Sequence, residues 1–211
     1  PFNVYKLRRA HDLPTTDMSL HMVFTGNPGT GKTMMARMMA RIYRSLDILS
    51  KGQLVEVDRS GLVAGYVGQT ALKTQKVIEK AMGGVLFIDE AYALNGKSEN
   101  DFGQEAIDTI LKAMEDHRDD LVVIVAGYTD LMEKFIHSNP GLESRFNRFL
   151  LFEDYSPDEM LAIFRMQCKK GCYQLAEGTE ELVRDYINEE NGDPETFGNA
   201  RGVRNCFEHI L

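Results

Sequence analysis

The sequence has no hydrophobic run long enough to suggest a membrane protein. No stretch approaches the roughly 18 consecutive apolar residues that mark a candidate membrane span. The N-terminus also lacks the charged-then-apolar pattern of a secretory signal. We therefore expect neither membrane insertion nor secretion, and we expect a cytoplasmic protein. The chain does not begin with Met and ends within an apolar helical pattern, so we expect both ends to be cut from a longer protein.

Cysteine is also scarce. The chain contains three cysteines, Cys168, Cys172 and Cys206, and an odd count without a secretory signal fits reduced thiols better than disulfides. Cys168 and Cys172 lie one helical turn apart, but no histidine lies close enough in sequence to complete a metal site with them. We expect no structural metal at these residues.

Positive charge is in deficit. The chain has 24 Lys and Arg against 32 Asp and Glu, which gives a formal net charge of −8. Non-specific binding to nucleic acid depends on Lys and Arg side chains that neutralise phosphates. The composition therefore argues against nucleic acid as a partner. The guanine-reading motif Asn-Lys-x-Asp is missing as well, which argues against a GTPase.

Residues 26–33 match the phosphate-binding pattern G-x-x-x-x-G-K-[ST] at every fixed position. Glycines let the backbone wrap around phosphates with its N–H groups turned inward. Lys32 adds a positive charge at the β- and γ-phosphates, and Thr33 offers a hydroxyl to Mg²⁺. The sequence therefore predicts a nucleoside triphosphate site. The predicted nucleotide-binding residues are Asn27, Pro28, Gly29, Thr30, Gly31, Lys32, Thr33 and Met34.

The segments on either side of this loop also fit the motif. Residues 20–25 are apolar and β-prone, which is typical of a buried strand that leads into the loop. Behind the loop, apolar residues recur at i, i+3, i+4 and i+7, which predicts a helix with one core-facing side. We expect that core-facing side to consist of Met35, Met38, Met39 and Ile42.

Two adjacent carboxylates follow the apolar segment 85–88. In a protein with a phosphate loop, an Asp at the end of such a strand holds Mg²⁺ directly or through water, which assigns Asp89 to the metal. Glu90 is then placed to polarise the attacking water as a general base. A solvated strand end is the alternative interpretation of the two acids, and the preceding phosphate loop favours the catalytic one.

Strand and helix signals alternate along the first three quarters of the chain. This alternation predicts a mostly parallel, five-stranded sheet with helices on both faces. After Phe152 only helical patterns follow, and Ser156, Pro157 and Glu159 form the signature of a capped helix start. We expect a large α/β domain over residues 1–153 and a small all-helical domain over 154–211. The strand signals lie near residues 20–25, 53–58, 84–89, 121–127 and 148–152.

Together these motifs make the sequence similar to the AAA+ ATPases and, more narrowly, to the CbxX/CfqX group. The resemblance implies a phosphate-loop α/β domain followed by a helical lid, with ATP and Mg²⁺ as ligands. It also implies a homo-hexameric ring that hydrolyses ATP and remodels a protein client through a central pore. The matching segments are residues 20–33, 65–70, 85–94, 101–108, 139–146 and 197–201, and the resemblance covers most of residues 18–211.

The resemblance also implies two arginines in the catalytic site. Arg145 stands where the family has an arginine finger that reaches the nucleotide of the neighbouring subunit. Arg148 is the alternative finger, and a surface pair between Arg145 and Glu143 is the non-catalytic interpretation. Arg201 matches the second sensor, which reaches from the lid to the γ-phosphate, and Arg204 shares its helical face.

The first sensor departs from the family pattern. Many AAA+ proteins carry an Asn after the fourth strand, whereas this sequence offers Tyr128 or Thr129 there. Either hydroxyl could orient the attacking water.

The resemblance places Tyr66 and Val67 in a pore loop after the second strand. An aromatic side chain can grip an extended polypeptide without demanding a particular sequence. A tyrosine buried in a turn is the alternative interpretation of Tyr66. The competing function is a nucleotide-switched scaffold or clamp-loader-like assembly protein without threading activity.

Overall fold

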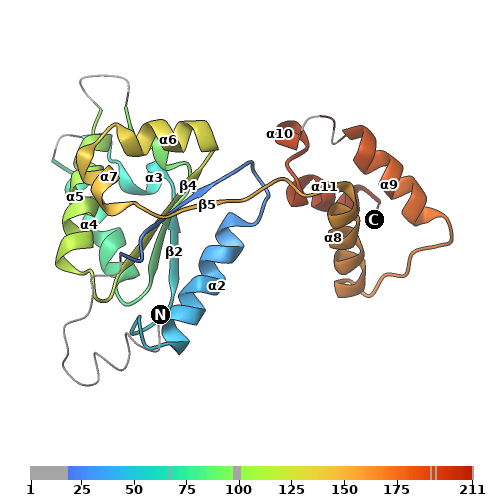
Figure 1. Ribbon diagram of the computed structural model, residues 1–211, viewed down its shortest axis with the longest axis horizontal. Coiled ribbons are helices and arrows are strands. Elements are labelled where there is room, and N and C mark those ends of the chain that lie inside the picture. The colour runs from blue at the N-terminus through green and yellow to red at the C-terminus, as the bar shows by residue number, and fades with distance from the viewer. Residues whose placement is uncertain (1–18, 67, 97–100, 191, 193, 211) are drawn as a thin grey trace.

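Five parallel strands form one sheet in the larger part of the molecule (Figure 1). The computed structural model describes residues 19–66, 68–96, 101–190, 192 and 194–210. The spatial order of the strands is β2-β3-β4-β1-β5, and every pairing is parallel. The predicted parallel five-stranded sheet is therefore confirmed. The strands are β1 (Met22–Thr25), β2 (Leu54–Val57), β3 (Val85–Ile88), β4 (Val122–Gly127) and β5 (Phe149–Leu151).

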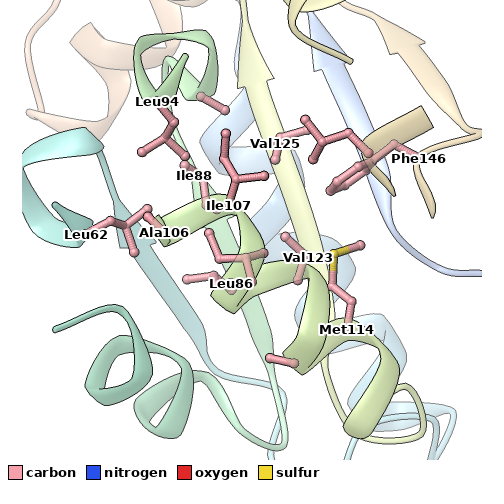
Figure 2. Packing of buried hydrophobic residues seen from close by; sticks show 14 of the residues in the cluster. Leu62, Leu86, Ile88, Leu94, Ala106, Ile107, Met114, Val123, Val125 and Phe146 are labelled. Atoms are coloured by element: carbon pink, nitrogen blue, oxygen red, sulfur yellow. The ribbon is translucent and has the colours of Figure 1, made fainter. Parts of the chain in front are cut away.

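Helices cover both faces of this sheet. Side chains alternate between the two faces along a strand, so Leu86 and Ile88 of β3 join one buried cluster while Val85 and Phe87 join another. Figure 2 shows the first cluster, where side chains of β3 and β4 pack against α5. This face carries α4 (Thr70–Ala81), α5 (Gly103–Asp116) and α6 (Thr129–His137), and the opposite face carries α2 (Lys32–Ser45).

The predicted core-facing side of α2 is wrong. The helix buries Ala36, Ala40 and Tyr43 against the sheet. Two small alanines one turn apart let the helix axis approach the strands closely, which turns the larger apolar side chains to the side. Met39 is half-buried, and the exposed fractions of the others are 37% for Met35, 46% for Met38 and 45% for Ile42.

An ion pair ties together two short elements beside the sheet, α3 (Arg59–Leu62) and the 3₁₀ helix η1 (Ala91–Leu94). Arg59 donates to the Ala93 carbonyl at 2.6 Å and to the Asp101 carboxylate at 2.8 Å. The hydrogen bond from Arg59 lowers the pKa of Asp101 below its usual range. The segment after Asp89 and Glu90 is thereby fixed to the start of the loop that carries Tyr66.

Among the described residues, only helices follow β5, as predicted for the lid (Figure 1). They are α8 (Pro157–Lys170), α9 (Thr179–Glu190), α10 (Pro194–Phe197) and α11 (Ala200–Ile210). The predicted capping box at the start of α8 is confirmed, because Ser156 and Glu159 each bond the other's backbone N–H. The lid has its own buried cluster, made of Met160, Leu161, Phe164, Cys168, Val183, Ile187, Val203 and Cys206.

Membrane spans and metal clusters are both missing from the described residues. None of their helices combines the length and apolar character needed to cross a membrane. Within the same residues, no three His, Cys, Asp or Glu side chains gather as a metal site, and all three cysteines are free.

One titratable side chain is built into the start of the sheet. His21 precedes β1, is 7% exposed, and accepts a hydrogen bond from the Val123 backbone N–H through Nδ1 at 3.0 Å. Burial lowers the pKa of His21 from 6.5 to about 4, and the nearby Arg145 acts in the same direction. The imidazole therefore stays neutral in the folded protein while it titrates near pH 6.5 in the unfolded chain.

We predict that His21 makes the fold sensitive to acid. Between pH 6.5 and about 4 the unfolded state binds a proton that the folded state does not, so stability falls as pH falls, by roughly 3 kcal/mol in all. His21→Asn should flatten this dependence, because Oδ1 of Asn can accept from Val123 without titrating. Urea unfolding across this pH range measures the difference in slope. His209→Asn, at an exposed position in α11, should leave the slope as in the parent, and an unchanged slope in His21→Asn would contradict the assignment.

Candidate active site

The loop between β1 and α2 presents unpaired backbone donors. Gly29 and Gly31 adopt φ values of 75° and 93°. In the part of the chain that the structure describes, no backbone carbonyl accepts from the N–H groups of Gly29 and of Gly31 to Met34. Lys32 Nζ donates to the carbonyl oxygens of Gly26 and Asn27, at 2.7 Å each. Free N–H groups and a cation at a helix N-terminus are what a phosphate chain requires, so the loop fits a nucleoside triphosphate.

Charged groups from three parts of the chain surround Lys32. Burial lowers the pKa of Lys32 below its usual range, and the Arg201 guanidinium of the lid acts in the same direction. The carboxylates of Asp89 and Asp154 oppose that shift. The predicted loop residue, metal residue and second sensor therefore lie within electrostatic reach of one another.

The predicted carboxylates lie at the end of β3. The Asp89 N–H donates to the Val57 carbonyl at 2.8 Å, which continues the pairing with β2. Glu90 is exposed and adopts a left-handed φ of 48°, and its N–H donates to Asp89 Oδ1 at 3.1 Å. A non-glycine residue in this region costs about 1–3 kcal/mol and persists where the surrounding structure imposes it. The end of β3 therefore holds the backbone of Glu90 in a strained conformation.

A third carboxylate, which the sequence motifs did not indicate, lies beside Thr33. Glu56 of β2 accepts a hydrogen bond from the Thr33 hydroxyl at 3.4 Å and lies 3.9 Å from Arg37. An acidic residue between two valines of a parallel strand is unusual enough to have signalled it. The oxygen ligands that Mg²⁺ prefers are therefore present here, with the Thr33 hydroxyl near Glu56 and Asp89 at the end of the adjacent strand β3.

The candidates for the first sensor follow β4. Tyr128 lies 6.3 Å, ring to ring, from Tyr92 of η1, a second residue that the motifs did not single out. Burial raises the pKa of Tyr92 to about 12, with smaller effects from Glu90, Tyr128 and Asp89. Thr129, the alternative, is exposed as the first residue of α6. Tyr92 thus lies beside Tyr128 and within electrostatic reach of Glu90 and Asp89.

The lid reaches the phosphate loop backbone to backbone. The Ala200 N–H donates to the Gly29 carbonyl at 3.3 Å. A Cβ atom on Gly29 would lie 2.1 Å from the Gly198 carbonyl oxygen and 3.1 Å from the Arg201 nitrogen. Gly29 is therefore required for the approach of the lid, in addition to its positive φ.

Side chains complete this contact. Asn199 Nδ2 donates to the Pro28 carbonyl at 3.2 Å and to the Asp154 carboxylate at 2.8 Å. Its Oδ1 accepts from the Tyr155 N–H at 2.8 Å. Asn27 donates to both oxygens of Asp154, at 3.1 and 2.9 Å. We call these five residues the loop–lid junction: Asn27, Pro28, Asp154, Tyr155 and Asn199.

Arg145 lies outside this assembly. It is the last residue of α7 (Pro140–Arg145), and it pairs with Glu115 of α5 at 3.1 Å and donates to the Gly141 carbonyl at 3.4 Å. Its buried Nε has no partner within the described residues. The alternative pairing with Glu143 is not found, because Glu143 lies 3.1 Å from His137 instead. The predicted finger thus pairs within its own chain, with a residue of α5.

Tyr66 stands on the loop between α3 and α4 with 73% of its surface exposed, so it is not buried in a turn. Lys73 of α4 holds the base of this loop by donating to the carbonyls of Ser60 and Val63, at 2.6 and 2.9 Å. Val67, the second predicted pore residue, lies outside the described residues.

Two family profiles match this chain. The family profile described as ATPase family associated with various cellular activities (AAA) matches residues 22–154, and the profile described as AAA lid domain matches residues 156–211. Protein CbbX of Cereibacter sphaeroides is 49% identical over 204 residues, which are 96% of this chain and 64% of the relative.

Two other relatives carry different names. The chloroplastic ribulose bisphosphate carboxylase/oxygenase activase of Cyanidioschyzon merolae is 47% identical over 206 residues, 97% of this chain and 70% of the relative. Stage V sporulation protein K of Bacillus subtilis is 43% identical over 210 residues, 99% of this chain and 65% of the relative. The predicted resemblance to the CbxX/CfqX group is confirmed, and the chain spans 64% to 70% of the length of these three relatives.

We predict that the close approach at Gly29 can be separated from its positive φ. Gly178 has a similar φ of 80°, and a Cβ atom there would meet nothing within 4 Å, so Gly178→Ala tests the conformational cost alone, about 1–2 kcal/mol. Gly29→Ala should cost more stability and weaken ATP binding at least about tenfold, because the Gly198 carbonyl must move. Urea unfolding and nucleotide titration measure both quantities. Equal effects of the two substitutions would show that the lid contact is unimportant.

Proposed function

The chain belongs to the ATPase family associated with various cellular activities (AAA), and on that premise we propose that it is a ring-forming motor that acts on a protein client. It is an ATPase, and the motor activity is the proposed part. The observation that carries the proposal is the distribution of the predicted catalytic groups. Asp89 and Arg201 both act electrostatically on Lys32 of the phosphate loop, whereas Arg145 pairs with Glu115 of α5 on the same copy. The site of one copy therefore lacks the positive charge of an arginine finger, and Arg145 of a neighbouring copy would supply it at a subunit interface.

Hydrolysis uses groups from three neighbouring strands. Lys32 exchanges the carbonyls of Gly26 and Asn27 for the β- and γ-phosphates. Thr33 and Asp89 would hold Mg²⁺, which would neutralise phosphate charge. Glu90 accepts the proton of the water that attacks the γ-phosphorus, and ADP leaves with the bridging oxygen. Tyr128 orients that water, with Tyr92 as its support.

Arg145 acts on the nucleotide of a neighbouring copy. A trans arginine that neutralises charge on the transferring phosphoryl group accelerates hydrolysis by about 10³ to 10⁵. Its pair with Glu115, whose side chain is 63% exposed, is weak enough to be exchanged, since surface ion pairs contribute about 0–1 kcal/mol. Arg148, exposed before β5, is the alternative. A trans finger implies a closed ring of copies, and we take a homo-hexamer as its form.

Client contact is assigned to Tyr66 and Val67 at the pore. The exposure of Tyr66 and the anchoring of its loop by Lys73 and Arg59 support this role, because a grip needs a free aromatic side chain on a fixed base. The relatives carry names from different processes, so sequence identity alone does not select the client.

The proposal also includes a domain boundary and a cellular location. The boundary between large domain and lid is placed at residues 153 and 154, which the start of α8 at Pro157 supports. A cytoplasmic location is supported by the free cysteines.

We predict that hydrolysis and client work can be separated by substitution. Glu90→Gln should lower kcat by about 10² to 10⁴ because the general base is lost, while ATP still binds. Tyr66→Ala should keep ATP hydrolysis and lose client remodelling. Phosphate release measures the first activity, and reactivation of inhibited ribulose bisphosphate carboxylase/oxygenase, for which the Cyanidioschyzon relative is named, measures the second.

Glu133→Gln, at an exposed site in α6, is the matched control and should leave both activities unchanged. Parental hydrolysis by Glu90→Gln would refute the role of Glu90. Full remodelling by Tyr66→Ala would instead refute the pore role of Tyr66.

A further inference from the structure

Asn199 is a fully buried amide at the point where the lid meets the phosphate loop. Its φ of 53° lies in the left-handed region, which Asn tolerates better than other residues with a Cβ. Both polar atoms of the side chain are used, Oδ1 by the Tyr155 N–H and Nδ2 by two acceptors. A buried polar side chain with every group satisfied specifies one arrangement of its surroundings.

The partners of Asn199 belong to different parts of the chain. Pro28 lies in the phosphate loop, and Asp154 and Tyr155 lie in the segment between β5 and α8. A single amide therefore joins the loop, the linker to the lid and the start of α11.

Arg201 follows Asn199 by two residues, in the first turn of α11. The intervening Ala200 bonds the Gly29 carbonyl, so the backbone between Asn199 and Arg201 has little freedom to move. Arg201 lies close enough to Lys32 to lower its pKa. The position of Arg201 over the loop thus depends on where Asn199 is held.

Asp154 makes the junction selective for an amide at position 199. Its carboxylate already accepts from Asn27 and Asn199, and it has no proton to donate. An Asp at position 199 would lose both donor contacts and place a second carboxylate against Asp154. An amide is the side chain of this size that can donate to Asp154 and accept from Tyr155 at once.

We propose that Asn199 is a positioning residue of the ATPase site, which holds Arg201 over the phosphate loop by fixing the first turn of α11 to Pro28 and Asp154. The inference rests on the role proposed above for Arg201 and assigns what places that arginine. Asn199 does not touch the nucleotide. Its effect passes entirely through Arg201.

The first test compares two chemically equal substitutions, one at the start of α11 and one within it. Asn199→Asp should lower kcat/KM for ATP about 10- to 100-fold, because a catalytic group displaced by an ångström loses that much. Asn205→Asp adds the same charge at an exposed position of α11 and should stay within about twofold of the parent. Equal kcat/KM values in the two variants would overturn the proposal.

The second test asks whether the effect passes through Arg201. In an Arg201→Ala background, Asn199→Asp should reduce kcat/KM by less than about twofold, because coupled residues are not additive. Asp154→Asn combined with Asn199→Asp should recover part of the loss, since the amide at position 154 can then donate to the carboxylate at position 199. An undiminished effect in the Arg201→Ala background would overturn the proposal, even if the reversed pair rescues.

A substitute variant and the effect of Arg201→Ala alone distinguish failure of this inference from failure of the proposed role of Arg201. If Asn199→Asp does not fold, Asn199→Gly accepts the same backbone conformation and should show the same dependence on Arg201. If Arg201→Ala alone leaves kcat/KM unchanged, the proposed role of Arg201 is wrong and the inference falls with it. If Arg201→Ala lowers kcat/KM and the Asn199 effect is additive to it, the inference alone fails.

Discussion

The phosphate loop and the lid approach each other so closely that a single Cβ atom would separate them. The contact between Gly29 and Gly198 is made by backbone alone, with a peptide hydrogen bond from Ala200 beside it. Such a contact fixes the relative position of its two sides more tightly than exposed side-chain pairs can, since long side chains adapt. The position of the lid, and with it the position of Arg201, therefore depends on the conformation of the phosphate loop.

The sheet supplies the other half of the site. The phosphate loop follows β1, the two carboxylates follow β3, and Tyr128 follows β4. These three strands are neighbours in the sheet, in the order β3-β4-β1. The carboxyl ends of parallel strands meet at one edge, where ligands bind in open α/β sheets. Strand order thus brings residues that are far apart in the sequence, from the phosphate loop at residues 26–33 to Tyr128, to one edge of the sheet.

Sequence patterns predicted the parts of this site that are contiguous in the chain. The phosphate loop, Asp89 with Glu90, the five strands and the capping box at Ser156 are local signals with fixed spacing. The apolar periodicity of α2 predicts the wrong core-facing side, because apolar spacing does not reveal which side of a helix packs when alanines allow a closer approach.

Sequence patterns of this kind cannot predict contacts between residues that are far apart in the chain. Asn199 and Pro28 are 171 positions apart, and Arg145 pairs with Glu115 of another helix rather than with the nearby Glu143. Glu56 and Tyr92 lie next to recognised motifs, but their neighbours are decided by strand pairing and by the packing of η1 against β4. These contacts depend on tertiary structure, which no local pattern encodes.

The central claim is that one copy of the chain holds an incomplete site. A mixture of Glu90→Gln and Arg145→Ala chains, each inactive alone, pairs an intact Glu90 with an intact Arg145 at about a quarter of the interfaces of a randomly mixed ring. Phosphate release by the mixture should therefore recover toward a quarter of the parental rate. If the mixture stays as inactive as its components, Glu90 and Arg145 do not meet across an interface, and the shared site is refuted.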